Sequence, residues 1–330
     1  MYTSAVIGLG NIGFRFSLDP LRKGVWSHVA AYEKSGYTRL AGAVEIDPGT
    51  VRLFKERHKK VPVFGSVSEL MRKTSPEIVS ICTPTATHYP ILKELSRSGV
   101  KAVFCEKPVA SSLREAREMV NLCRKKGILL AVNHTRRWES GYLAAKKAID
   151  GGRIGKVTAV NCLYPAQVFN IGTHLFDIVR FLISADPETV SGVSFDPGKQ
   201  DPGVSGWMIF NGKIPCTINV LNKRENLVFE VDIIGDKGRV KITENGGKLD
   251  LSVFRKSRRY SGYMELTPAP ARPLPRKDRF IEAVDDIAKV LMHRKRSVNC
   301  SGEDGLIALS MSQALLASAS NGSRPVSIKF

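Results

Sequence analysis

The feature that most constrains this chain is the stretch VIGLGNIG, which places Gly8, Gly10 and Gly13 in GxGxxG spacing directly after an apolar run. Directly after a strand, this spacing is typical of a turn that binds a dinucleotide. Gly8 permits the tight turn, Gly10 lets the backbone approach a pyrophosphate, and Gly13 allows the following helix to pack closely. Asn11 and Ile12 complete the turn, where amides at a helix start can hold phosphate charge. The alternative is a glycine-rich turn without a ligand.

The first part of the chain alternates strand and helix patterns. Short apolar runs rich in Val, Ile and Ala are typical of parallel strands covered on both faces, and the segments between them have apolar residues every three or four positions. The expected strands lie at residues 4–9, 39–45, 77–83, 102–107 and 129–134. We therefore expect a doubly wound parallel sheet, a Rossmann domain, over residues 1–128.

The pattern changes in residues 129–330, where extended segments are separated by Gly, Asn and Asp turns. The expected strands lie at residues 156–164, 189–195, 206–212, 214–222, 227–235, 238–246 and 248–255. A helix at 174–183 interrupts them, and a proline-rich connection at 266–278 leads to two helices at 279–294 and 303–322. This half is predicted to be an α+β domain with one largely antiparallel sheet, its closing helices free to pack back on the first domain.

A dinucleotide-binding unit needs an acidic residue about 20 positions after the glycines, where it binds the adenosine ribose. Glu45 ends the second expected strand, but it lies 45 − 13 = 32 positions beyond Gly13. The excess coincides with the segment 16–27, which contains Pro20 and cannot be an uninterrupted helix. If this segment is an insertion, the spacing becomes ordinary. Glu45 followed by Ile46 favours NAD over NADP, because a carboxylate repels a 2′-phosphate.

The composition excludes several classes of protein. The net charge of +19 raises the question of nucleic acid, but the basic residues are dispersed and carry no nucleic-acid-binding signature, so we expect a solvated basic surface. No apolar run is long enough to span a membrane. The N-terminus does not have the pattern of a signal peptide, so we expect a cytoplasmic protein. The six scattered cysteines favour buried, reduced thiols over a disulfide framework or a metal site.

Three further segments carry a family resemblance. AVFCEKPVASS, the segment TPTATH and the segment NIGTHLFD, together with VIGLGNIG, resemble the Gfo/Idh/MocA family of glucose-fructose oxidoreductases and inositol dehydrogenases. The resemblance covers nearly the whole chain. It implies a nucleotide-binding domain, then an α/β domain with a large open sheet, and hydride transfer between NAD or NADP and a sugar or cyclitol hydroxyl.

The resemblance also implies site residues at matching positions. The turn residues and Glu45 match the family's cofactor loop and ribose acid. The remaining positions implied to lie near the cofactor are Thr83, Pro84, His88, Glu106, Lys107, Pro108 and Arg137. His174 matches the catalytic histidine, and Asp177 lies three residues farther along the same helix. Many members have aspartate where this chain has Asn170, which can orient a substrate but cannot carry a proton.

The chemistry explains why a lysine and a histidine should act together. Oxidation of an alcohol removes the hydroxyl proton as hydride leaves the carbon, so a base must reach the oxygen. With Thr173 as the expected N-cap, His174 lies in the first helical turn, where the helix dipole favours neutral imidazole. Lys107 would stabilise charge that develops on the oxygen. The Lys107–Pro108 peptide is often cis in the family.

The segment 16–27 carries a further hypothesis. It would emerge at the carboxyl edge of the sheet, where such sheets bind ligands, so Arg22, Lys23 and Trp26 are candidates to line the substrate mouth. A surface excursion without such a role is the alternative.

Taken together, the cofactor motif and the family resemblance imply an NAD-dependent oxidoreductase acting on a secondary hydroxyl of a sugar, cyclitol or nucleotide sugar. Lys107 and His174 are the catalytic candidates, and Asn170, Lys23 and Trp26 are substrate-binding candidates. We expect no nucleic-acid or membrane partner, and a homodimer or homotetramer formed through the second domain's sheet. The alternatives are an NAD-dependent glycosidase that works by transient oxidation and a non-catalytic NAD-binding sensor or scaffold.

Overall fold

The computed structural model describes residues 1–196, 198–270 and 277–330. They form two compact units. The first contains Met1–Trp138 and Asp278–Leu306, and the second contains Glu139–Lys277 and Ile307–Phe330. The sequence placed the division after residue 128. The first unit continues to Trp138 because the segment that follows residue 128 completes its sheet. The closing helices were expected to be free to pack back on this unit, and Asp278–Leu306 belongs to it.

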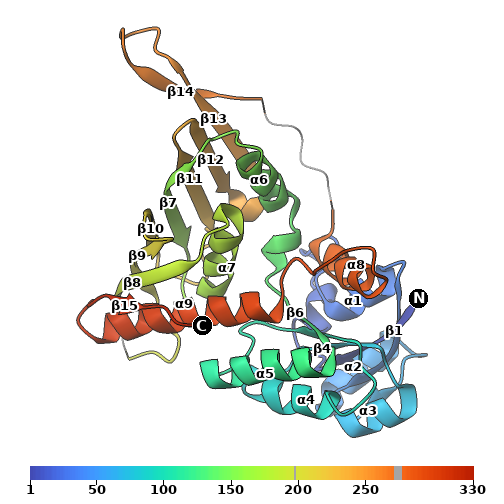
Figure 1. The fold of residues 1–330 in the computed structure, drawn as a ribbon. Helices are drawn as coiled ribbons and strands as arrows, with labels where there is room; N and C mark the ends of the chain where they lie inside the picture. The colour runs from blue at the N-terminus through green and yellow to red at the C-terminus, as the bar shows by residue number, and fades with distance from the viewer. Residues whose placement is uncertain (197, 271–276) are drawn as a thin grey trace. The chain divides into compact units, whose positions relative to one another are not determined.

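The first unit is built on a six-stranded parallel sheet in the order β3-β2-β1-β4-β5-β6 (Figure 1). This confirms the predicted doubly wound sheet; only the two-residue strand β3 was not expected. The strands are β1 (Tyr2–Ile7), β2 (Thr38–Val44), β3 (Val63–Phe64), β4 (Ile78–Ile81), β5 (Ala102–Cys105) and β6 (Leu129–Val132). The helices are α1 (His28–Lys34), α2 (Pro48–Arg57), α3 (Val67–Thr74), α4 (His88–Leu95), α5 (Leu113–Lys126) and α8 (Arg279–Leu291).

Four helices of this unit begin where a polar side chain caps them. Ser27, Asp47, Ser66 and Ser112 each accept a hydrogen bond from the backbone amide three residues later. Such a cap satisfies one of the amides that have no partner inside the helix, and it contributes about 1 kcal/mol to stability. The caps explain why serine or aspartate precedes these four helices, whereas α4 begins after Thr87 without a side-chain cap.

The segment 16–27 is a loop between the glycine turn and α1, within the connection that joins β1 to α1. The amides of His28 and Val29 donate to the carbonyl oxygens of Ile12 and Gly13, each at 3.1 Å, so α1 begins directly on the glycine turn. The side-chain oxygens of Ser17 and Ser27 lie 2.6 Å apart and close the base of the excursion. The chain thus leaves and rejoins the Rossmann connection, as an insertion would.

The second unit is a nine-stranded sheet in the order β14-β13-β12-β11-β7-β10-β9-β8-β15. All its strand pairs are antiparallel except β7 with β10. The strands are β7 (Val157–Tyr164), β8 (Pro187–Ser194), β9 (Val204–Phe210), β10 (Ile214–Val220), β11 (Glu230–Gly235), β12 (Gly238–Thr243), β13 (Lys248–Lys256), β14 (Met264–Pro268) and β15 (Val326–Ser327). The predicted α+β domain with a largely antiparallel sheet is confirmed.

Three helices supply apolar side chains to the core on one face of this sheet (Figure 1). They are α6 (Ser140–Asp150), α7 (Gly172–Ile183) and α9 (Gly302–Ser320), of which α9 belongs to this unit from Ile307 onward. The sequence did not predict α6 or the edge strands β14 and β15. Part of the proline-rich connection expected at 266–278 forms β14, where Pro268 is tolerated at the sheet edge. Residues 271–276 of that connection lie outside the described residues.

Two expectations from composition can be compared with the fold. All six cysteines are buried and free of disulfide bonds, as predicted. None of the helices in the described residues combines the length and apolarity needed to cross a bilayer.

Candidate functional site

The glycine turn at the end of β1 has the three properties that pyrophosphate binding requires. Gly8 has a φ of +91°, and a Cβ there would lie 2.9 Å from Thr83 Cγ2. A Cβ on Gly13 would lie 2.0 Å from the Gly8 carbonyl oxygen, which no side chain allows. Around Gly10, by contrast, a Cβ would meet nothing within 4 Å. The turn therefore needs glycine at its two packed positions and leaves the backbone at Gly10 open to a ligand.

Glu45 follows β2 and lies against the glycine turn. One carboxylate oxygen accepts the Leu9 amide at 2.8 Å, and the other accepts the amides of Ile46 and Asp47 at 2.8 and 2.9 Å. These bonds tie two adjacent strand ends together despite the long separation in sequence. They leave lone pairs on both oxygens, since an ionised carboxylate has about four acceptor positions. Both oxygens therefore keep acceptor positions, and a role in binding the adenosine ribose stays a prediction for this residue.

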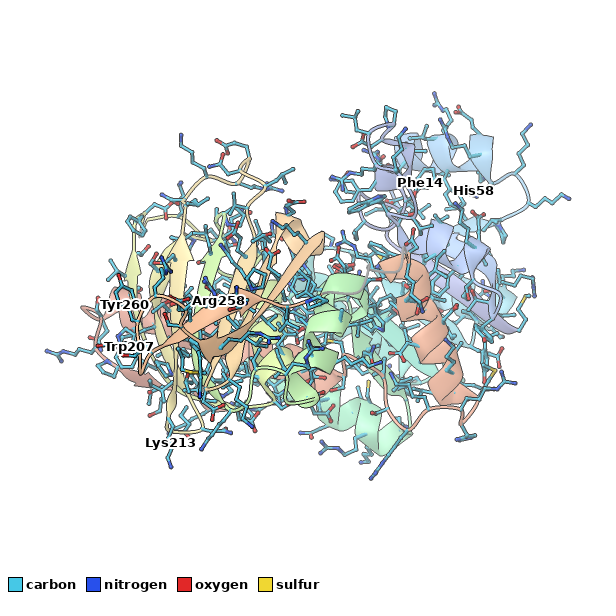
Figure 2. All side chains as sticks on the ribbon, turned by 90° about the horizontal axis from the view of Figure 1, so that it is seen from above. Phe14, His58, Trp207, Lys213, Arg258 and Tyr260 are labelled. Carbon is cyan, nitrogen blue, oxygen red and sulfur yellow. The ribbon has the colours of Figure 1, made fainter. Side chains whose placement is uncertain are left out.

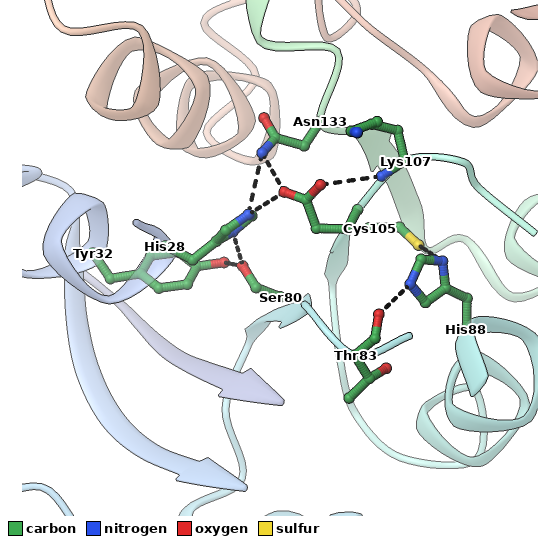
Figure 3. Close-up of polar contacts among 9 residues, drawn as sticks. His28, Tyr32, Ser80, Thr83, His88, Cys105, Lys107 and Asn133 are labelled. Atoms are coloured by element: carbon green, nitrogen blue, oxygen red, sulfur yellow. Dashed lines mark hydrogen bonds and ion pairs between the residues drawn. The ribbon is translucent and has the colours of Figure 1, made fainter. Parts of the chain in front are cut away.

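The His88 side chain contacts the two segments that follow β4 and β5. Its Nε2 lies 2.9 Å from the Thr83 carbonyl oxygen (Figure 3). Its Nδ1 lies 3.2 Å from the Val109 carbonyl oxygen. The ring is buried, with 1% of its surface exposed. His88 therefore holds the backbone of Thr83 and Pro84 in place from the buried side.

The segment Glu106–Lys107–Pro108 follows β5, and the Lys107–Pro108 peptide is cis. Glu106 Oε1 lies 2.9 Å from His28 Nε2 and 2.5 Å from Asn133 Nδ2 (Figure 3). Burial raises the pKa of the Glu106 carboxyl, but the hydrogen bond and charge of His28, the charge of Lys107 and the Asn133 amide outweigh it, so the pKa lies below its usual value. Glu106 is therefore ionised at neutral pH.

Arg137 lies in the short turn after β6 and is almost completely buried. Its guanidinium donates to the carbonyl oxygen of Asn299 at 2.8 Å and pairs with the Asp304 carboxylate at 3.0 Å. Both contacts tie the turn to the returning segment of the same unit. A position near the nicotinamide stays a prediction for this residue.

His174 lies in the first turn of α7, in the second unit, and is half-buried. The expected N-cap was wrong. Thr173 is already helical, its hydroxyl donates to the Phe169 carbonyl oxygen at 2.9 Å, and Ile171 occupies the cap position without a side-chain hydrogen bond. The helix begins earlier because Gly172 also adopts helical geometry. His174 nevertheless remains at the positive end of the helix dipole. The expected preference for a neutral imidazole depends on this position and does not depend on the N-cap.

Asp201 is a residue that the sequence interpretation missed. Its two carboxylate oxygens accept the amides of Phe169 at 2.8 Å and Asn170 at 3.0 Å. The Asn170 side chain in turn donates to Gln167 Oε1 at 3.0 Å. These bonds fix the segment that leads into α7. Asp201 lies in a Gly- and Pro-rich stretch with no periodicity, so only its carboxylate marked it in the sequence.

A pocket of about 260 Å³ opens beside this segment in the second unit. It is lined by polar side chains from three loops, among them Gln167, Asp196, Asp201, Asn222, Lys223 and Arg224. Asp196 pairs with Lys199 at 2.5 Å, and Asp201 accepts the two backbone amides described above. Glu225 also lines the pocket, so both basic and acidic side chains surround it.

The two candidates in the insertion differ in their surroundings. Lys23 is exposed, whereas Trp26 lies with its ring between two guanidinium groups, 5.1 Å from Arg22 Cζ and 4.5 Å from Arg279 Cζ. The insertion is also fastened to α8, because the Val25 amide donates to Asp278 at 2.6 Å. Trp26 thus has a packing role of its own, and a role in substrate binding stays a prediction for both.

The first unit brings many of the candidate residues to one sheet edge. The glycine turn, Glu45, Thr83 and the Glu106–Pro108 segment all follow the carboxyl ends of neighbouring parallel strands, where sheets of this kind bind ligands. Asn170 and His174 belong to the second unit.

Comparison with known proteins agrees with this arrangement. Residues 3–134 match an oxidoreductase family with an NAD-binding Rossmann fold, and residues 146–328 match the C-terminal α/β domain of that family. An inositol 2-dehydrogenase of Rhizobium meliloti is 27% identical over 280 residues, which cover 76% of this chain and 81% of the relative. Two uncharacterized oxidoreductases of Schizosaccharomyces pombe are each 30% identical, but the alignments cover only 38% and 39% of those relatives.

Solved structures share the fold. An aldose-aldose oxidoreductase from Caulobacter crescentus superposes with a TM-score of 0.80 at 19% identity, covering 99% of both chains. The WlbA dehydrogenase from Bordetella pertussis, solved with NADH and UDP-GlcNAcA, superposes with a TM-score of 0.79 at 18% identity, covering 100% of this chain and 99% of the other. With both of its domains matched, the chain belongs to the Gfo/Idh/MocA oxidoreductases, whose first domain is an NAD-binding Rossmann fold.

Proposed function

We propose that the protein transfers a hydride between NAD and a secondary hydroxyl or ketone of a sugar, cyclitol or nucleotide sugar. The observation that carries the proposal is the common sheet edge in the first unit. There the open glycine turn, the ribose-binding carboxylate and Lys107 follow neighbouring strands. Inositol 2-dehydrogenase and the WlbA dehydrogenase, among the similar proteins, act on or bind molecules of these classes by name.

NAD is the cofactor that these residues fit, and it supplies the acceptor for hydride. Gly10, Asn11 and Ile12 would approach the pyrophosphate, and Glu45 would accept hydrogen bonds from the ribose diol. The residue after Glu45 is the exposed Ile46, so no cation follows the carboxylate to favour a 2′-phosphate. Thr83, Pro84 and the Glu106–Pro108 segment would flank the rest of the cofactor.

Two side chains would act on the reacting oxygen. His174 would remove the hydroxyl proton, since a neutral imidazole at a helix N-terminus is an acceptor near neutral pH. Lys107 would donate a hydrogen bond to the same oxygen and stabilise the charge that develops on it. Asn170 would orient the substrate by hydrogen bonds. It cannot move a proton, so the proton chemistry is assigned to His174.

The polar pocket beside Asn170 supports a substrate rich in hydroxyl groups or carrying an anionic substituent. Asn222, Lys223 and Arg224 present donors to the oxygen atoms of such groups, and the Glu225 carboxylate in the same lining can accept hydrogen bonds from hydroxyl groups. Lys23 and Trp26 in the insertion would contribute further contacts.

The second unit's sheet supports a homo-oligomer. One face is covered by three helices, whereas Val193 on β8 is 53% exposed. Trp207 on β9 is 44% exposed (Figure 2). We infer that copies of the chain associate through this uncovered side of the sheet as a dimer or tetramer. Buried free cysteines suit a reducing compartment, so we place the protein in the cytoplasm.

The function is tested by following NADH formation with a panel of sugars, inositols and nucleotide sugars. We expect the wild-type protein to reduce NAD with at least one of them. We expect His174→Ala and Lys107→Met each to lower kcat by about 10²- to 10³-fold with NAD affinity preserved. Lys101→Ala is the matched control, because Lys101 precedes the opposite end of β5 and pairs with Glu77 at 2.7 Å.

The outcomes separate the alternatives. Full turnover by His174→Ala would contradict the mechanism. Cleavage of glycosides without accumulation of NADH would identify an NAD-dependent glycosidase. Normal NAD binding with no reaction on any compound would indicate a sensor or scaffold.

A further inference from the structure

A chain of buried polar side chains runs through the first unit and ends at Glu106 (Figure 3). It begins with the Tyr32 hydroxyl, 2.6 Å from Ser80 Oγ, which lies 2.8 Å from His28 Nδ1. His28 Nε2 then lies 2.9 Å from Glu106 Oε1. Tyr32, Ser80 and His28 have no exposed surface. Polar groups buried this completely are costly unless they are hydrogen-bonded, so the arrangement is highly specified.

The chain holds the Glu106 side chain from two directions. An ionised carboxylate has only acceptors, so His28 must carry a proton on Nε2 and donate to Oε1. The Asn133 amide donates to the same oxygen, while Oε2 accepts the Lys107 backbone amide at 3.3 Å. Through that last bond, the position of the Glu106 carboxylate constrains the backbone from which the Lys107 side chain starts.

His28 is itself fixed by its surroundings. Its ring packs on Phe104, with the ring centroids 4.8 Å apart, and on Phe280, with the centroids 5.7 Å apart. Its backbone amide bonds the glycine turn. His28 is thus the residue at which the start of α1, the strand β5 and the helix α8 meet.

We propose that His28 is a positioning residue for Lys107, acting through the Glu106 carboxylate. The proposal rests on the function proposed above, in which Lys107 contacts the reacting oxygen. A small displacement of a catalytic group is enough to slow a reaction about 10²-fold. Loss of the His28 hydrogen bond should therefore lower kcat while NAD and substrate still bind.

The first test compares His28→Phe, which keeps a ring against Phe104 and Phe280 but removes the donor, with His28→Gln, which keeps an amide donor. We expect His28→Phe to lower kcat by about 10- to 100-fold, with KM and NAD affinity within about threefold of wild type. We expect His28→Gln to recover most of the activity. The matched control is His58→Phe in the same unit, where the histidine stacks on Phe54 at 4.5 Å and bonds Glu33.

Unchanged kcat in His28→Phe would overturn the proposal, as would equal losses of kcat in His28→Phe and His28→Gln. If His28→Phe does not fold, Asn133→Ala replaces it, because it removes the other donor to the same carboxylate oxygen. A fall in kcat of about 10-fold with NAD affinity retained then supports the proposal, and unchanged kcat contradicts it.

A second readout does not depend on turnover. Lysines labelled with carbon-13 methyl groups give separate NMR signals, and Lys107→Arg identifies the signal of Lys107. We expect that signal to shift in His28→Phe and to stay unchanged in His58→Phe. If no substrate is ever turned over but the signal shifts, the proposed function fails while the positioning role stands. If turnover is found and the signal does not move, the positioning role fails.

Discussion

Glu45 shows how one side chain can link distant parts of the sequence. Its carboxylate accepts the backbone amide of Leu9 and two amides of the following loop, so it holds the second strand's end against the glycine turn. The proposed function also assigns these oxygens to the adenosine ribose. Glu45 would then combine a role in stability with a role in cofactor choice.

We expect Glu45→Gln to weaken NAD binding by about tenfold, because a neutral amide is a poorer acceptor for the ribose diol. The same change should narrow the preference for NAD over NADP, since it removes the charge that repels a 2′-phosphate. Titration of both cofactors by fluorescence checks this. An unchanged ratio of the two affinities would mean that Glu45 does not face the ribose.

At the residue scale, sequence motifs predicted which residues form the glycine turn better than they predicted the contacts between distant side chains. Gly8 and Gly13 occupy the tight turn expected from their spacing, and Glu45 contacts that turn despite its long spacing, because residues 16–27 leave and rejoin the connection. The contact between His28 and Glu106 joins residues 78 positions apart and follows from the packing of two strands and a helix, which no local pattern encodes. The N-cap expected at Thr173 was wrong because a threonine hydroxyl inside a helix can instead bond the carbonyl four residues earlier.

At the scale of elements, the insertion is the clearest departure from an ordinary Rossmann unit. Its two ends meet at Ser17 and Ser27, and α1 continues from the glycine turn as though the insertion were absent. The insertion should therefore be separable from cofactor binding. Lys23 is exposed, whereas Trp26 packs against Arg22 and Arg279, so substrate contacts by the insertion stay a prediction.

We expect replacement of residues 17–26 by two glycines to leave NAD affinity within about threefold of wild type and to raise the substrate KM. Lys23→Ala should raise KM in the same direction without a loss of stability. KM measured for every active substrate checks the prediction. If neither variant changes any KM, the insertion is only a surface excursion.

Most helices and strands were predictable because their apolar periodicity and caps agree with the tertiary structure. The exceptions have physical reasons. The two-residue strands β3 and β15 are too short to show alternation. The helix α6 begins after Glu139 without a side-chain cap, and β14 contains a proline that predicts a connection as readily as an edge strand.

At the scale of the whole chain, the sequence left open that the closing helices pack back on the first domain, but it could not predict which residues return. Asp278–Leu306 returns to the first unit, where Trp138 bonds Asp286 at 2.9 Å and Arg137 pairs with Asp304. The packing of this C-terminal segment on the first unit depends on contacts between residues far apart in the sequence, which local patterns do not encode. The two-domain architecture itself was predictable, because strand patterns of two different kinds occupy the two halves of the sequence.

The exposed side of the second unit's sheet leads to a prediction about assembly. We expect Trp207→Glu to shift the oligomer toward smaller species, because a buried carboxylate at an interface is costly. Lys213→Glu, a charge change on the turn between β9 and β10 in the same unit, is the control (Figure 2). Sedimentation velocity checks both. A mass that is the same for wild type and Trp207→Glu would place the interface elsewhere.

The central claim is that a hydride moves directly between the substrate carbon and NAD. It is tested most directly with an active polyol deuterated at the carbon that bears the reacting hydroxyl, by examining the nicotinamide ring of the product by NMR. We predict that deuterium appears on the nicotinamide ring of NADH in the wild-type protein and that its transfer is about 10²- to 10³-fold slower in Lys107→Met. Formation of oxidised product with no deuterium on the nicotinamide would contradict the account.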